Sequence, residues 1–175
     1  AALPRWGMHP RVLDLTIPLV RQDLRLAQDA AVHGLGLAVA LNKADLVTPE
    51  ALAALRTEAG EYLQHRFPQL GRLPVVFCSA LDGSGVDALR ASLVEVARLR
   101  RVRTTPAALS ELAGAWPSTG RSWRIRQIEA GPPAFLATPP PGVKRDARFV
   151  ANRLREALGL HGVPVLIRWP ERKER

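Results

Sequence analysis

The sequence predicts an α/β protein in which a parallel-sheet domain, residues 1–100, precedes a small α+β domain, residues 101–175. Two apolar runs without alternation, LGLAVAL at 35–41 and PVVFC at 74–78, are typical of strands buried on both faces of a parallel sheet. A segment with apolar residues at helical spacing follows each run. The composition then changes at 100–105, where basic residues cluster, and this change indicates the domain boundary.

The first half of the first domain predicts a helix, a strand and a second helix. Residues 22–33 form a helical segment that ends at Gly34, and the buried strand that follows stops at Asn42. Thr48-Pro49-Glu50 supplies an N-cap, a proline at the first helical position and an acid in the first turn, so a helix should begin there. The apolar stripe of this helix is Leu52, Leu55, Ala59, Leu63 and Phe67.

The two ends of the first domain are less regular. After the second strand, a glycine-rich loop at 79–85 leads into a helix that reaches the basic cluster. Its expected inner stripe is Val86, Leu89, Leu93 and Val96. At the beginning, only Val12-Leu13 precedes Asp14, which is too short for a central strand and indicates further sequence upstream.

The second domain predicts the order αββαβ. A short helix begins at Thr105-Pro106, Trp123 to Ile128 alternates as a strand, and residues 133–138 form its neighbour. Asp146 caps a helix that ends at Gly159, and residues 163–169 form the last strand. The helix stripe consists of Phe149, Val150, Leu154, Ala157 and Leu158.

The charge distribution points to an anionic partner for the second domain. Residues 1–95 hold 9 basic and 10 acidic residues, whereas residues 96–175 hold 16 and 6. Such a concentration favours a phosphate backbone, with a solvated, solubilising face as the alternative. The single cysteine, Cys78, leaves no pair for a disulfide, and four scattered histidines give no metal-ligand spacing. No apolar run is long enough for a membrane span.

Asn42-Lys43-Ala44-Asp45, directly after a buried strand, has the N-K-x-D arrangement that reads guanine. The Watson–Crick edge of guanine presents two adjacent donors, which the Asp45 carboxylate could accept together, whereas adenine lacks that pair. Lys43 could lay its aliphatic stem along the base while its ammonium reaches loop carbonyls. Asn42 could tie its own loop to the next one.

The next strand ends in Ser79-Ala80-Leu81, which has the form of the S-A-[KL] loop of guanine-nucleotide-binding proteins. Right-handed crossovers make the two strands parallel, so both loops should lie at one edge of the sheet. An ordinary strand-to-helix turn at each place is the alternative reading.

These loops resemble those of P-loop GTPases of the translation-factor class, and the fuller resemblance is to the Der (EngA) family of ribosome-assembly GTPases. Leu13-Asp14, Thr16-Ile17-Pro18, Gln22-Asp23-Leu24 and the two loops look like part of its second G domain. The segments after residue 100 look like its KH-like C-terminal domain; they are Trp123 to Ile128, Gly131-Pro132-Pro133, Arg148 to Leu158 and Gly162 to Val165.

The resemblance implies a partial P-loop GTPase-type domain that binds GTP or GDP, with an Ala80-type backbone N–H meeting guanine O6. It also implies docking on large-subunit ribosomal RNA, with ribosomal proteins or other assembly factors as partners. Neither a G-x-x-x-x-G-K-[ST] loop nor a D-x-x-G switch is identified in the chain, so Mg²⁺ is expected only with a P-loop upstream and no catalytic residue is assigned. Ala44 stands where the family often has Trp.

Arginines and lysines that oppose apolar faces in the second domain are the expected exposed RNA contacts. They are Arg124, Arg126, Lys144, Arg145, Arg148, Arg153 and Arg155. Gly159-Leu160-His161-Gly162 matches the G-x-x-G clamp of KH domains, but it follows the last helix, which favours a helix cap and turn. Three tryptophans could stack on bases, although core packing is favoured; they are Trp116, Trp123 and Trp169.

Two functions from different classes rank first, ahead of a basic protein that binds acidic partners only by electrostatic attraction. One is a ribosome-assembly GTPase of the Der type seen without its P-loop. The other is a non-catalytic ribosome- or RNA-binding assembly factor that keeps a degenerate G domain as a scaffold. The expected compartment is the mitochondrial matrix, with the bacterial cytoplasm as the alternative.

Overall fold

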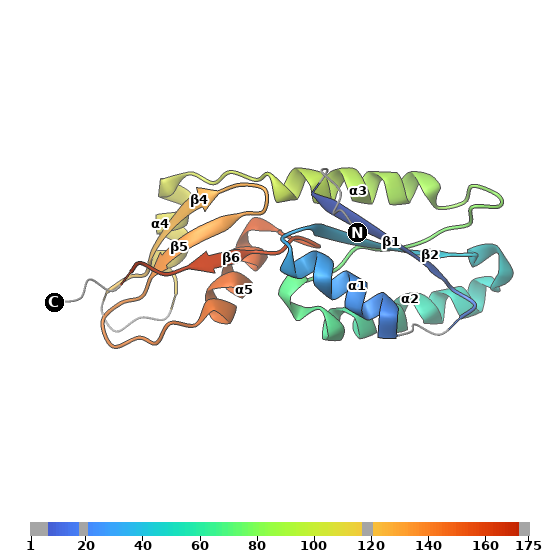
Figure 1. The fold of residues 1–175 in the computed structure, drawn as a ribbon, viewed down its shortest axis with the longest axis horizontal. Coiled ribbons are helices and arrows are strands. Elements are labelled where there is room, and N and C mark those ends of the chain that lie inside the picture. Colours follow the sequence, from blue (N-terminus) through green and yellow to red (C-terminus); the bar gives the residue numbers. More distant parts are fainter. Residues whose placement is uncertain (1–6, 18–20, 117–120, 172–175) are drawn as a thin grey trace.

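The computed structural model describes residues 7–17, 21–116 and 121–171, and Pro18 of the resemblance motifs lies outside these ranges. Figure 1 shows two lobes, each built on its own three-stranded sheet. The first lobe extends from β1 to α3 and the second from α4 to β6. This arrangement gives the α/β class that the sequence predicts. The boundary between residues 100 and 101 stays a prediction.

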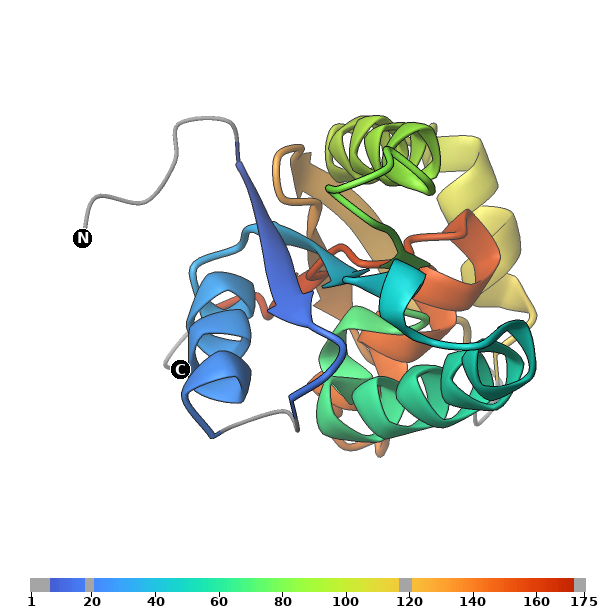
Figure 2. The same cartoon turned by 90° about the vertical axis from the view of Figure 1, so that its right-hand side faces the viewer.

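The first sheet is entirely parallel, with the order β1 (Met8–Asp14), β2 (Gly36–Asn42), β3 (Val75–Phe77). Since each strand lies beside the one before it, the crossover helices fall on the same face. Figure 2 shows α1 (Arg21–Val32) and α2 (Pro49–Arg66) on that face and α3 (Val86–Arg100) on the other. Two single-turn 3₁₀ helices, η1 (Ala44–Leu46) and η2 (Pro68–Leu70), follow β2 and α2.

The buried core of this lobe confirms the reading of its central strand. Every residue of β2 except Asn42 is buried, as expected when helices cover both faces. Thr48 caps α2 by accepting a hydrogen bond from Ala51 N–H at 3.4 Å. Along the predicted α2 stripe, burial increases toward the C-terminal end, and Leu63 and Phe67 are completely enclosed.

The strand β1 differs from the sequence expectation, because it has seven residues and not two. His9, Pro10 and Arg11 hide it by interrupting the apolar pattern. Gly36 N–H donates to Gly7 O and Leu15 N–H donates to Asn42 O, both at 2.9 Å. The backbone N–H and C=O groups of the odd-numbered residues of β1 therefore point toward β2. Pro10 therefore faces the outer edge, where its missing N–H disrupts no bond to β2.

The stripe predicted for α3 is buried at one end only. Val86 is 45% exposed, Leu89 and Leu93 are half-buried, and Val96 is fully buried. The first turns of α3 follow a loop beyond the three-residue strand β3, so little of the sheet lies beneath them. Figure 1 shows this helix running along the first lobe toward the second.

The second lobe has the predicted order αββαβ. Its elements are α4 (Pro106–Gly114), β4 (Arg124–Glu129), β5 (Ala134–Thr138), α5 (Ala147–Leu158) and β6 (Leu166–Arg168). Strand β5 pairs antiparallel with β4 and parallel with β6. Trp116 and Trp123 are buried in its core with their rings edge to face, 5.9 Å between centroids, so the core reading holds for both. Trp169 is half-buried beside them.

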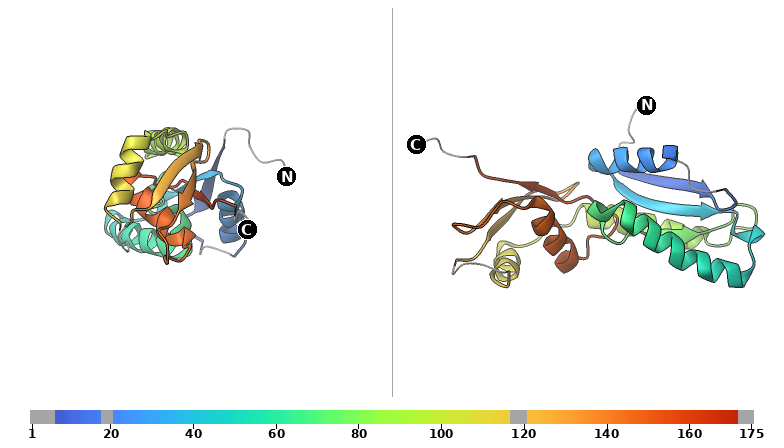
Figure 3. Two further views of the ribbon diagram at one scale, coloured as in Figure 1. Left: turned by 90° about the vertical axis from the view of Figure 1, so that its left-hand side faces the viewer. Right: turned by 90° about the horizontal axis from the view of Figure 1, so that it is seen from below.

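Both lobes share a junction core. Val96 and Leu99 of α3 pack against Leu160 and Val163, which follow α5. The side chain of Gln127 also fixes the connecting segment: its amide donates to Val102 O and accepts from Thr104 N–H, both at 2.8 Å. The right-hand view of Figure 3 shows the two lobes meeting end to end at this junction.

Candidate functional site

The loops that follow β2 and β3 lie against each other at one edge of the first sheet. The Asn42 Oδ1 atom accepts a hydrogen bond from Ala80 N–H at 2.9 Å, and Ala44 N–H donates to Cys78 O at 3.0 Å. The first bond ties the Asn42 loop to the next loop, as expected of Asn42, and the second is a backbone link between the same loops. The prediction that both loops share one edge is also confirmed, because the strands are parallel and end side by side.

Lys43 takes an unusual backbone conformation for a residue with a side chain, with φ of 69°. Its Nζ lies 2.6 Å from the Asp14 Oδ2 atom at the end of β1. A carboxylate is a strong acceptor for an ammonium, and the expected contact with loop carbonyls stays a prediction because the ammonium has three N–H donors. The ion pair connects the end of β1 to the loop that follows β2.

Asp14 is held in place from several directions. Besides Lys43, its Oδ1 accepts hydrogen bonds from Thr16 N–H at 2.9 Å and from the Thr16 hydroxyl at 2.6 Å. The hydrogen bond from Lys43, followed by those from Thr16, lowers the pKa of Asp14 to about 2. Sequence reasoning assigned this residue no site role, although an aspartate at the carboxyl end of a parallel strand is a signal that could have found it.

Asp45 lies in the 3₁₀ turn η1, immediately after the residue that fixes the loop to β3. Its side chain is exposed, as is that of Leu46 beside it. A carboxylate in this position is accessible to a ligand that approaches the edge of the sheet. It can accept two parallel hydrogen bonds from one planar donor group.

The Ser79-Ala80-Leu81 loop is built around a buried hydroxyl. Ser79 is fully buried, and its Oγ accepts from Leu81 N–H at 3.2 Å and from Asp82 N–H at 3.4 Å. Ala80 N–H, which the resemblance assigns to guanine O6, donates to Asn42 in this structure. Leu81 is 86% exposed at the tip of the loop. Contact between Ala80 N–H and a base would therefore require this N–H to be shared with Asn42 or released from it.

The end of the same loop is fixed by Asp82, which sequence reasoning did not single out, and by Gly85 of the Gly83-x-Gly85 pair that belongs to the family resemblance. The Asp82 Oδ1 atom accepts from Ser84 N–H at 2.8 Å, and this backbone bond is the main reason that the pKa of Asp82 is lowered. Gly85 has φ of 72°, and a Cβ there would overlap the Phe77 carbonyl oxygen. Asp-x-x-Gly directly before a helix could have indicated both roles.

The single cysteine, Cys78, is a buried side chain. It is 5% exposed at the end of β3, and burial raises the pKa of its thiol, which disfavours the nucleophilic thiolate.

Six of the seven predicted RNA contacts are exposed. Arg124 and Arg126 alternate with Ile125 on β4, and Lys144 and Arg145 precede α5. Arg145 lies over the Trp169 ring, 5.8 Å from its centroid. The remaining two exposed residues, Arg148 and Arg153, lie on α5.

Arg155 departs from the expectation of an exposed phosphate contact, since only 5% of it is accessible. Its guanidinium donates to the Asn152 side chain at 2.8 Å and to the backbone carbonyl of Gln69 in η2 of the first lobe. The aliphatic part packs on Gly71, where a Cβ would overlap the arginine chain. Helical spacing placed Arg155 opposite the apolar face of its own helix, but the other lobe covers that position.

The Gly159–Gly162 segment is a turn at the junction of the lobes, as its place in the sequence favoured. Gly159 ends α5 with φ of 62°, and Leu160 is fully buried. Gly162 accepts from Leu37 N–H at 2.8 Å and donates to Leu70 O at 3.0 Å. Its backbone polar groups are therefore used within the protein, which argues against an RNA clamp.

Two features of the described residues bear on cofactors and membranes. No group of three or more His, Cys, Asp or Glu side chains in the described ranges could hold a metal ion. Within the same ranges no helix is both long and apolar enough to cross a bilayer.

Comparison with known proteins shows the family of the chain. The GTPase Der of Azorhizobium caulinodans is 35% identical over 167 residues, which cover 88% of this chain and 36% of that protein. The proteins of the same name from Cereibacter sphaeroides and Parvibaculum lavamentivorans are each 32% identical, and each match covers 88% of this chain. The chain belongs to the Der (EngA) family.

This Der-family chain spans about a third of the length of those relatives, which is 34% to 36% in the three examples. No protein-family model matches it. Among solved structures, the cytosolic domain of the FeoB iron transporter of T. maritima in apo form aligns with 91% of this chain and 56% of that chain. The identity is 16% and the TM-score 0.37. The α/β assignment rests on the strand order and crossovers described above.

Proposed function

We propose that this chain is the guanine-reading and RNA-binding part of a ribosome-assembly GTPase of the Der type. The observation that carries the proposal is the hydrogen bond from Ala80 N–H to Asn42, which brings the two base-recognition loops together. Asp45 stands exposed in the same loop as Asn42. Its carboxylate has the acceptor geometry for the paired donors of guanine, and the Lys43–Asp14 pair fixes the lysine stem beside it.

Nucleotide selectivity tests the guanine site. The chain is titrated against fluorescent guanine, adenine and xanthine nucleotides, and we expect a preference for guanine. Asp45→Asn should move the preference toward xanthine by about 10- to 100-fold, because the amide can donate to the xanthine C2 carbonyl. Asp87→Asn, an exposed acid in the first turn of α3, is the matched control and should leave selectivity unchanged. Equal binding of all three bases by the unmodified chain would refute the proposal.

The proposed site on these residues does not extend to the phosphates of the nucleotide or to magnesium. The 175 residues contain no G-x-x-x-x-G-K-[ST] loop, so we assign them recognition of the base only. Hydrolysis in the proposed GTPase would depend on phosphate-binding residues other than these. We therefore place no catalytic step on any residue of the chain.

The proposed RNA partner is large-subunit ribosomal RNA, together with ribosomal proteins or other assembly factors. Exposed arginines on β4 and basic residues before α5 support it, since guanidinium groups bind phosphates and their contacts release counterions. Arg124→Ala with Arg126→Ala should weaken binding to a ribosomal RNA fragment and reduce its salt dependence. We propose the mitochondrial matrix as the compartment, with the bacterial cytoplasm as the alternative.

A second candidate function is a non-catalytic RNA- or ribosome-binding assembly factor. The hydrogen bond from Ala80 N–H to Asn42 favours it, because it occupies the N–H that the resemblance assigns to guanine O6. Such a factor would bind ribosomal RNA and ignore all nucleotides, so the titration above distinguishes it from the first proposal.

A further inference from the structure

A buried arginine at the junction of the lobes lacks a counter-ion. Arg155 is 5% exposed, and its two described partners, the Asn152 amide oxygen and the Gln69 carbonyl, are both neutral. Its Nε has no hydrogen-bond partner, and among the described residues no carboxylate forms an ion pair with it. Burial lowers the pKa of this guanidinium, the direction expected for a charge removed from water without compensation.

The same arginine lines a groove at the junction of the lobes, made up of two hollows that share lining residues. One hollow of about 720 Å³ and another of about 660 Å³ meet along a shared wall. The residues of this wall are His65, Pro68, Arg148, Asn152 and Arg155. The groove thus lies between the end of α2 with η2 in the first lobe and α5 in the second.

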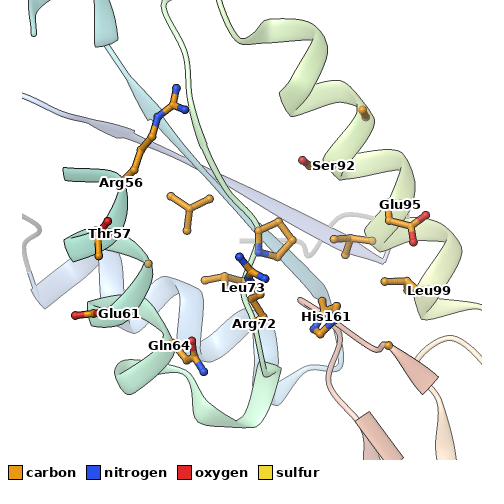
Figure 4. A pocket seen from close by; sticks show the side chains of 16 residues that line it. Arg56, Thr57, Glu61, Gln64, Arg72, Leu73, Ser92, Glu95, Leu99 and His161 are labelled. Carbon is orange, nitrogen blue, oxygen red and sulfur yellow. The ribbon is translucent and has the colours of Figure 1, made fainter. Parts of the chain in front are cut away.

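The rim of the groove is mainly basic. Its exposed arginine and histidine side chains are His65, Arg66, Arg72, Arg148 and His161. Figure 4 shows Arg72 and His161 in the adjoining hollow between α2 and α3, which they also line. Of the two acids on the rim, Glu61 and Glu156, the latter lies 3.9 Å from Arg153, which offsets its charge.

We propose that this groove holds the phosphate backbone of RNA, so that the bound strand contacts both lobes. The inference rests on the proposed RNA-binding function and adds a site that includes the first lobe. A phosphate on the rim would supply the negative charge that Arg155 lacks, and the low-polarity surroundings would strengthen this attraction. The rim continues into the exposed Arg148 of α5, so a strand can pass from the groove onto the basic surface of the second lobe.

Arg72 gives the sharpest test, because it belongs to the first lobe and has no part in the RNA surface proposed above. Binding of a fluorescent single-stranded ribosomal RNA fragment is measured by anisotropy over a range of KCl concentrations. Arg72→Ala should weaken binding about 10-fold and lower the salt slope by roughly 0.7, the loss of one phosphate contact. Arg90→Ala, an exposed arginine on α3 away from the groove, is the control and should change neither.

The outcomes separate this inference from the proposed function. If Arg124→Ala with Arg126→Ala weakens RNA binding while Arg72→Ala behaves like the control, the groove is not the site and the RNA function stands. If the unmodified chain binds no RNA, both fail. Equally strong binding of an acidic peptide, competing with RNA and sensitive to Arg72→Ala, would identify a protein partner and overturn the inference.

A second experiment measures the NMR signal of the Arg155 side chain in the unmodified chain, because a substitution at this position could destabilise the junction. The arginine Nε–H signals are followed by ¹H–¹⁵N NMR during RNA titration, with Arg155→Lys used only for assignment. The Arg155 signal should shift on RNA addition and return when high salt releases the RNA. A signal that stays fixed while RNA is bound would overturn the proposed compensation of its charge.

Discussion

Replacement of Gly162 by alanine should separate the two lobes locally without unfolding either sheet. Gly162 has φ of 67°, a conformation that alanine avoids. An alanine Cβ would lie 2.6 Å from the Leu37 carbonyl oxygen and 2.8 Å from Pro74 Cδ. The first of these atoms belongs to the central strand and cannot move cheaply, so the glycine segment must move instead.

The size of this effect follows from three contributions. The left-handed conformation costs about 1–2 kcal/mol for a residue with a Cβ. Displacement weakens the two backbone bonds of Gly162, to Leu37 at 2.8 Å and Leu70 at 3.0 Å, each worth about 0.5–1.5 kcal/mol net. The expected loss is therefore about 2–5 kcal/mol, concentrated at the junction.

Gly159→Ala is the matched control, three residues away in the same turn. Gly159 also has a positive φ, 62°, but a Cβ there would meet nothing within 4 Å. It should lose only about 1–2 kcal/mol. Urea unfolding measures both losses, and hydrogen exchange at the Leu37 amide reports the junction directly, with protection lost in Gly162→Ala and kept in Gly159→Ala. Equal destabilisation by the two variants, or full protection of Leu37 in both, would refute the reasoning.

Two further predictions concern the candidate site. Because Lys43 and Thr16 lower the folded pKa of Asp14 to about 2, its contribution to stability is complete above the unfolded pKa of about 4 and disappears as the pH falls through about 2. Unfolding measured from pH 6 to 2 should therefore show Asp14→Asn less stable at pH 6 and converging with the unmodified protein near pH 2; a constant difference would contradict this assignment. Gly85→Ala should destabilise the protein by about 2–4 kcal/mol, since its Cβ would overlap the Phe77 oxygen, whereas Gly83→Ala, with φ of 81° and open space, should lose about 1–2 kcal/mol. Thermal unfolding of the pair checks this, and equal midpoints would show that the overlap is relieved without cost.

The sequence was sufficient where local chemistry and chain order determine the result. Capping at Thr48 and Asp146 fixed the starts of two helices, because a side-chain oxygen satisfies otherwise unpaired N–H groups. The apolar run of β2 required cover on both faces, and right-handed crossovers then required parallel strands. Asn42 could be placed against the Ser79 loop for the same reason.

The sequence was insufficient to predict the contacts and burial of a residue that packs against a distant part of the chain. The pattern could not reveal that the ammonium of Lys43 pairs with a carboxylate on β1, because that strand was itself hidden by Pro10. Helical spacing described which side of α5 carries Arg155, but spacing along one helix contains no information about a second lobe. The same limit applies to Val86, whose stripe extends beyond the sheet that should cover it.

The sequence by itself determined the order of elements, the parallel sheet and the two loops at its edge, because these follow from short-range patterning and from the handedness of the chain. Only the tertiary structure decided which charges are exposed and which are enclosed. Burial of an arginine depends on surfaces brought together from residues far apart in the sequence, as at Gln69 and Arg155. Such a contact produces no periodic pattern in the sequence, so the sequence alone could not predict it.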